Sequence, residues 1–97
     1  MLNLSPTATS ILTLLNNINE LIVKSSDRKN AEEVMRALRV YAKGKGFAIN
    51  EDNLNNFNAI LIDARPYTLT MCLKDIADDV IKVDTKNKKK KFKAISS

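Results

Sequence analysis

Histidine and tryptophan are absent from this 97-residue chain, and cysteine occurs only once, at Cys72. Without histidine, zinc sites built from histidine and cysteine are excluded, as are Ser-His and Cys-His nucleophile pairs. A lone cysteine cannot form an intrachain disulfide, which suits a reducing compartment, and in an apolar run it is typical of core packing. We therefore expect no cofactor, no metal site and no enzymatic activity.

Glycine and proline are also scarce, with two residues of each, and aromatic residues make up only 5% of the chain. So few turn-forming residues argue against a loop-rich or all-β fold. The core must be built from aliphatic side chains, and the chain length allows one domain with a modest core. We expect a helical domain over residues 1–85 and a distinct lysine-rich segment over residues 86–97.

Targeting and membrane signals are missing as well. The first 23 residues carry no Lys or Arg, so they lack the charged start of a signal peptide. Asparagines and Glu20 interrupt the apolar stretch 11–23, which excludes a membrane span there. These features predict a cytoplasmic protein, or a nuclear one in a eukaryotic or viral setting. Abundant Asn, Ile and Lys indicate an AT-rich genome, such as that of a virus, a phage or a low-GC bacterium.

Positive charge is concentrated near the C-terminus. Residues 86–93 hold six of the sixteen basic residues, whereas residues 1–85 hold ten basic and eleven acidic residues, net −1. A dense cationic run beside a near-neutral body is typical of proteins that meet a polyanion, because each neutralised phosphate releases counterions. A solvated tail, a membrane surface or an acidic protein partner are the alternatives.

The first predicted helix begins at Pro6 with Ser5 as its N-cap, because serine before proline is a common helix start. A broad apolar stripe follows at helical spacing. It fits either a core face or a homodimer interface through residues 8–22. The residues expected at such an interface are Ile11, Leu14, Leu15, Ile18, Leu21 and Ile22.

A second helix is predicted over residues 28–43, capped by Ser25, Ser26 and Asp27. Five basic residues fall on an arc of about 100° opposite its apolar side. They are Arg28, Lys29, Arg36, Arg39 and Lys43. Glu32 lies within the arc and could pair with Arg36. The stripe is therefore either a solvated, salt-bridged face or a phosphate-contacting one.

The second half of the chain predicts two more helices. One Gly of the pair Gly44 and Gly46 should provide a left-handed C-cap for the second helix. Residues 47–49 fit a brief strand, and Asn50 caps a third helix over residues 51–64, which Pro66 ends. In residues 67–83, apolar residues first alternate with polar ones, as in a strand, but a longer run has helical spacing, which favours a helix. Alternation returns over residues 81–95 and fits a β-hairpin with a lysine-rich tip.

This order of elements resembles the winged helix-turn-helix family. Residues 31–46 would be its first helix, 47–49 its first strand, 51–64 its second helix and 67–76 its recognition helix. Residues 80–83 would enter the wing and 86–95 would complete it. Three acidic residues depart from the family pattern, because Asp75, Asp78 and Asp79 would repel phosphates at a groove. A four-helix bundle with a basic tail fits the same sequence.

Two functions follow from these patterns. The first is a small nucleic-acid-binding protein, which could act as a regulator and would contact backbone phosphates. Double-stranded DNA or RNA is favoured over single strands, since exposed aromatic residues are few. Its contact residues would be Arg28, Lys29, Arg36, Arg39, Lys43, Lys86, Lys88, Lys89, Lys90, Lys91 and Lys93. The second is a helical adaptor or inhibitor that binds a protein through its first helix or through residues 46–85, which carry seven acidic and three basic residues. Nucleic-acid binding needs the second-helix stripe and the lysine-rich segment on one surface.

Overall fold

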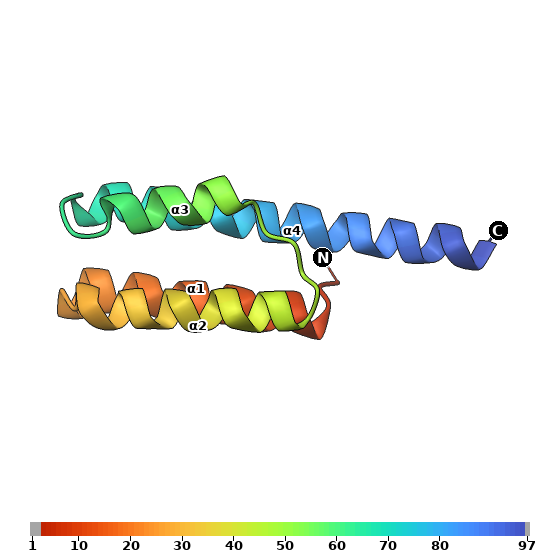
Figure 1. The fold of residues 1–97 in the computed structure, drawn as a ribbon, viewed down its shortest axis with the longest axis horizontal. Coiled ribbons are helices and arrows are strands. Elements are labelled where there is room, and N and C mark those ends of the chain that lie inside the picture. The colour runs from red at the N-terminus through yellow and green to blue at the C-terminus, as the bar shows by residue number, and fades with distance from the viewer. Residues whose placement is uncertain (1–2, 97) are drawn as a thin grey trace.

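Four helices account for most of residues 3–96, which the computed structural model describes, with side chains as far as Asn87. They are α1 (Pro6–Ser25), α2 (Arg28–Gly44), α3 (Glu51–Ile60) and α4 (Pro66–Ser96). In Figure 1, α1 and α2 form one layer, α3 and α4 form the other, and α4 continues well past the ends of its neighbours. The mainly helical fold is confirmed. Across residues 3–96, no helix has the length and apolar character needed to cross a membrane.

The helix starts follow from local side-chain caps. The Ser5 hydroxyl accepts a hydrogen bond from the Ala8 amide at 3.1 Å, and the Asp27 carboxylate accepts one from the Asn30 amide at 3.0 Å. Asn50 caps α3 in the same way. Gly46 has a φ of 67°, so the expected left-handed glycine after α2 is confirmed. These caps satisfy amide groups that a helix start cannot pair by itself.

The core fills the space between the two layers with aliphatic side chains. The apolar stripe of α1 supplies Ile11, Leu15, Ile18 and Ile22, each between 0% and 4% exposed. Leu14 and Leu21 are half-buried against the same core. Four of the six residues expected at a dimer interface are thus buried within a single chain. A dimer through residues 8–22 would have to use the outer side of α1.

Two expectations for the segment after α2 are wrong: the strand and the end of the third helix. Residues 47–49 connect α2 to α3 without forming a strand. The third helix ends at Ile60 instead of residue 64, and a turn follows over residues 61–64. The reason lies outside the segment: the guanidinium of Arg28 donates to the carbonyl oxygens of Leu61 and Ala64, each at 2.6 Å. This side chain replaces the helical partners that those carbonyls would otherwise need.

The β-hairpin considered for residues 81–95 is also absent from the described chain. Residues 3–96 contain no strand, and 81–95 continue α4 without interruption. The stretch has no Gly or Pro to turn the chain, and Lys is a good helix former. The winged-helix resemblance therefore loses support for its wing, and the four-helix alternative is compatible with the fold.

A buried carboxylate marks the point where α4 leaves the other helices. Asp84 is only 3% exposed. Its two oxygens accept hydrogen bonds from Ser5, one from the amide at 3.0 Å and one from the hydroxyl at 2.6 Å. Ser5 thereby caps α1 and joins it to α4. Beyond Asp84, α4 extends past the ends of α1, α2 and α3 (Figure 1).

We expect Ile18→Ala to lower the free energy of unfolding by about 2–5 kcal/mol, the range for aliphatic core truncations. Val40→Ala, which trims a side chain that is 68% exposed, should change it by less than about 0.5 kcal/mol. Urea denaturation followed by circular dichroism measures both. Equal, small effects would contradict the assignment of the α1 stripe to the core.

Candidate nucleic-acid interface

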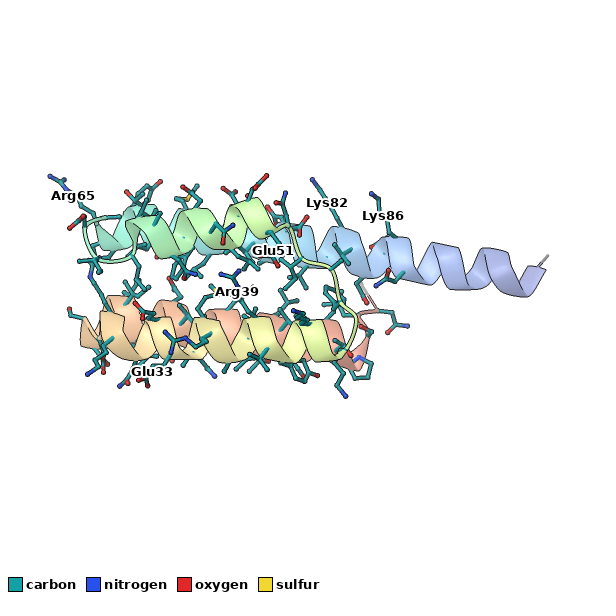
Figure 2. All side chains as sticks on the ribbon, viewed as in Figure 1. Glu33, Arg39, Glu51, Arg65, Lys82 and Lys86 are labelled. Carbon is teal, nitrogen blue, oxygen red and sulfur yellow. The ribbon has the colours of Figure 1, made fainter. Side chains whose placement is uncertain are left out.

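The lysine-rich segment, residues 86–93, lies on the part of α4 that extends beyond the other helices (Figure 1). Lys82 and Lys86 are exposed and point away from the layer of α1 and α2 in Figure 2. At about 1.5 Å of rise per residue, all six lysines of the segment fall within about 11 Å measured along the helix axis. That is about one charge per 2 Å, close to the value of about one per 1.7 Å for duplex DNA.

The position of these lysines on a helix has two opposed electrostatic effects. Cations near a helix C-terminus interact favourably with the helix dipole. Like charges four residues apart repel each other and destabilise the helix, and Lys86–Lys90 and Lys89–Lys93 are such pairs by position. A bound polyanion would remove this repulsion. The segment is therefore a helix that phosphate binding would stabilise.

Arg28 of the predicted α2 stripe has a structural role. It is half-buried at the start of α2 and holds the turn after α3 through its two carbonyl contacts. Hydrogen bonds from a charged guanidinium to carbonyl oxygens are stronger than hydrogen bonds between two neutral groups. The side chain would have to leave these oxygens to bind phosphate. Lys29, its neighbour, is exposed.

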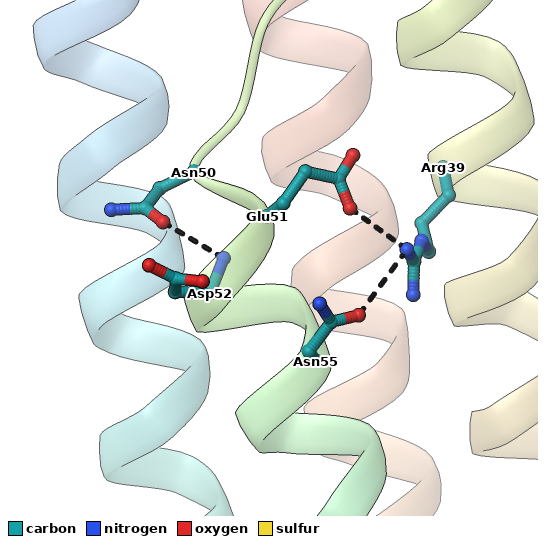
Figure 3. Close-up of polar contacts among 5 residues, drawn as sticks. All are labelled: Arg39, Asn50, Glu51, Asp52 and Asn55. Atoms are coloured by element: carbon teal, nitrogen blue, oxygen red, sulfur yellow. Dashed lines mark hydrogen bonds and ion pairs between the residues drawn. The ribbon is translucent and has the colours of Figure 1, made fainter.

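Arg39 is engaged in a similar way in the middle of α2. Its guanidinium pairs with Glu51 at 2.8 Å and donates to Asn55 at 3.4 Å, as Figure 3 shows. The Arg39 side chain is 32% exposed and the Glu51 side chain 69%, so only the arginine is partly shielded from water. Arg36 forms the expected pair with Glu32 at 3.4 Å, but both are well exposed and such a pair adds little stability. Arg36 is thus the arginine of the stripe that could exchange its partner most easily.

Only one end of the basic stripe on α2 lies close to the lysine-rich segment. Arg28 and Lys43 stand at opposite ends of α2, about 22 Å apart along the helix axis. Lys45, just past α2, lines the same surface pocket as Asp84 and Asn87 and therefore lies beside the base of the segment. The structure thus brings the end of α2 to the lysines and leaves its start far away.

Two basic residues near the base of the lysine-rich segment were not predicted from the sequence as contact residues. Lys45 lies in the turn between Gly44 and Gly46, where helical periodicity does not apply, and its ammonium is 5.8 Å from the centre of the Tyr41 ring. Lys82 precedes Lys86 by one helical turn on an exposed face. Spacing of four residues within a continuous helix would have identified Lys82. Only the fold identifies Lys45.

The acidic residues of α4 do not gather into a metal site. Among the side chains described, no three His, Cys, Asp or Glu residues are arranged to hold an ion. Asp79 accepts a hydrogen bond from the Asn50 amide at 2.8 Å and so helps to position the start of α3. Asp75 and Asp78 are exposed. They make the outer face of α4 unfavourable for phosphate.

Cys72 lies in the core and is 8% exposed. Burial raises the pKa of its thiol, a hydrogen bond from the Asn56 side chain lowers it, and the nearby Asp75 carboxylate raises it, with a net upward shift. A raised pKa keeps the sulfur protonated and weakly nucleophilic at neutral pH. The local environment therefore gives no support to a reactive thiol.

Comparison of the chain with protein-family models, with curated proteins and with solved structures finds no match.

Arg28→Ala should lower the free energy of unfolding by about 2–3 kcal/mol, because two carbonyls lose a charged donor. Lys29→Ala removes an exposed cation next to it and should cost less than about 0.5 kcal/mol. Chemical denaturation of both variants tests the difference. Similar stability of the two would show that Arg28 is dispensable for the fold and available for ligand binding.

Proposed function

We propose that this protein binds nucleic acid, double-stranded DNA or RNA in preference to single strands, through the lysine-rich segment of α4. The observation that carries the proposal is the extension of α4 beyond the other helices, with six lysines on its last turns. Their spacing along the helix approaches the charge spacing of a duplex. Contacts of this kind are made to phosphates and carry little base information.

The charges of the remaining chain support a contact confined to this end. Residues 1–85 are close to neutral, and Arg28 and Arg39 are held in intrachain bonds. Exposed Asp75 and Asp78 would repel a phosphate backbone along the outer face of α4. Lys43, Lys45 and Lys82 are exposed, and Lys45 and Lys82 lie near the base of the segment, where they would extend the contact.

The preference for double strands rests on the position of the aromatic side chains. Binding of single strands usually relies on bases stacked on exposed aromatic rings. Tyr67 is 75% exposed, but it lies at the start of α4, at the far end from the lysines. Tyr41 is half-buried. Phe92 lies among the lysines in the sequence, outside the side chains that the structure describes. Among the described side chains, no exposed aromatic ring lies near the lysines, and phosphate contact without stacking favours a regular duplex backbone.

A protein adaptor is the second candidate function, and the exposed carboxylates of α4 favour it. Residues 46–85 carry a net charge of −4 from seven acidic and three basic residues. A basic partner could dock against Asp75 and Asp78. The first helix is a weaker docking element than the sequence indicated, because its apolar stripe fills the core of the same chain.

Replacing Lys90 and Lys91 with Gln should reduce the slope of log affinity against log salt by about 1.8, since each phosphate contact on duplex DNA contributes about 0.9. The matched control is Lys29→Gln with Lys43→Gln, which removes the same charge from α2 and should change the slope by less than about one unit. Fluorescence anisotropy with a duplex at several salt concentrations measures both.

The outcomes separate the two functions. A slope unchanged by the Lys90 and Lys91 substitutions, or no duplex binding by the unmodified protein, would reject the proposal and leave the adaptor as the better candidate. A larger reduction in the control would move the principal contact from α4 to α2. Equal affinity for unrelated duplex sequences is expected, because phosphate contacts do not read bases.

A further inference from the structure

The turn between α1 and α2 and the turn between α3 and α4 lie at the same end of the molecule (Figure 1). Four exposed apolar side chains belong to residues in or near these turns. Val23 is 55% exposed, Ile62 76%, Tyr67 75% and Met71 41%. We call these four residues the loop-end patch. The remaining large apolar side chain of comparable exposure among the described residues, Val40, stands apart on α2.

Contacts between the helices place the four residues of the patch at the same end of the molecule. Thr70 of α4 donates a hydrogen bond to Asn19 of α1 at 2.6 Å. Val23 lies one helical turn beyond Asn19, and Tyr67 lies about one turn before Thr70, so both approach the same end of the α1–α4 pair. Met71 follows Tyr67 by four positions and adjoins it along α4. The patch thus spans both layers.

The turn that carries Ile62 is held firmly. Arg28 binds the carbonyl oxygens on either side of it, at Leu61 and Ala64. Ile62 therefore projects from a fixed turn and not from a free loop. A rigid group of exposed apolar side chains is typical of a protein-binding surface.

The charges around the patch indicate its partner. Exposed charged residues within four positions of a patch residue comprise three bases and three acids. They are Lys24, Arg65, Lys74, Glu20, Asp63 and Asp75. A partner of one charge sign would meet repulsion as often as attraction. A second copy, related by a two-fold axis, presents the same balanced rim and can set each charge against its opposite.

We propose that the loop-end patch is the interface of a homodimer, in which two copies meet end to end. The lysine-rich segments would then lie at the two outer ends of the dimer. The chain is 49 Å long. The segments would be separated by far more than the Debye length of about 8 Å at physiological salt, so their repulsion would not oppose assembly.

The arrangement would give the dimer two phosphate-binding ends that face away from each other. It would therefore bridge two duplexes or two distant sites on one. This consequence rests on the proposed nucleic-acid binding, whereas the dimer itself does not. Assembly can be tested without any nucleic acid.

Sedimentation velocity of the full chain at high micromolar concentration should show a dimer. Ile62→Glu and Tyr67→Glu each place a charge in the patch and should give monomers. Val40→Glu, at a comparably exposed apolar position on α2, should remain dimeric. Because all three side chains are largely exposed, circular dichroism should show unchanged helix content. A monomeric unmodified protein would overturn the proposal, as would equal dissociation of the Val40 variant.

A second measurement keeps the dimer distinct from the proposed function. Energy transfer between two differently labelled duplexes reports bridging, and anisotropy reports binding of one duplex. Ile62→Glu should abolish bridging and retain binding. A dimer that binds no duplex would refute the proposed function alone, and a monomer that binds a duplex would refute the dimer alone. Bridging retained by a monomeric Ile62 variant would contradict the link between the two.

Discussion

The apolar repeat of α4 ends before the helix does, and this difference in length governs the organisation of the protein. Among the side chains described on α4, Val80 is the last fully buried aliphatic one. Asp84 follows it one turn later and accepts hydrogen bonds from Ser5. Up to that point the helix is stabilised by packing against the core. Beyond it, stability depends on helix propensity and on continuation from a helix already formed. Core packing and the proposed polyanion contact therefore involve successive parts of one helix.

Arginine and lysine have separate uses in this chain. Arg28 and Arg39 reach carbonyl and carboxylate oxygens of other elements and join α2 to α3. The planar guanidinium suits such fixed geometry, because several donors are held in one orientation. The lysines of α2 and α4 remain exposed where side chains are described. Lysine, a hydrated point charge on a flexible stem, suits phosphate contacts that do not depend on exact geometry.

Local chemistry was predictable from the sequence, and long-range contacts were not. Ser5, Asp27 and Asn50 could be identified as caps because a cap acts within three residues. The early end of α3 depends on Arg28, a residue 33 positions before Leu61. Alternation over residues 81–95 indicated a hairpin, but this stretch has no Gly or Pro and is rich in Lys, and it continues α4 as a helix. The lysine-rich segment was evident from composition, but the intrachain bonds of the α2 arginines required the folded chain.

The continuity of α4 fixes an angular relation between its two parts. Successive positions on an α-helix differ by about 100° around the axis, so each residue after Asp84 has a set direction relative to the buried face of the helix. A single-residue insertion after Asp84 would rotate the whole lysine-rich segment by about 100° without altering its composition. A flexible linker there would remove the relation altogether. The number of residues between Asp84 and the first lysines therefore determines on which side of the helix, relative to its buried face, those lysines stand.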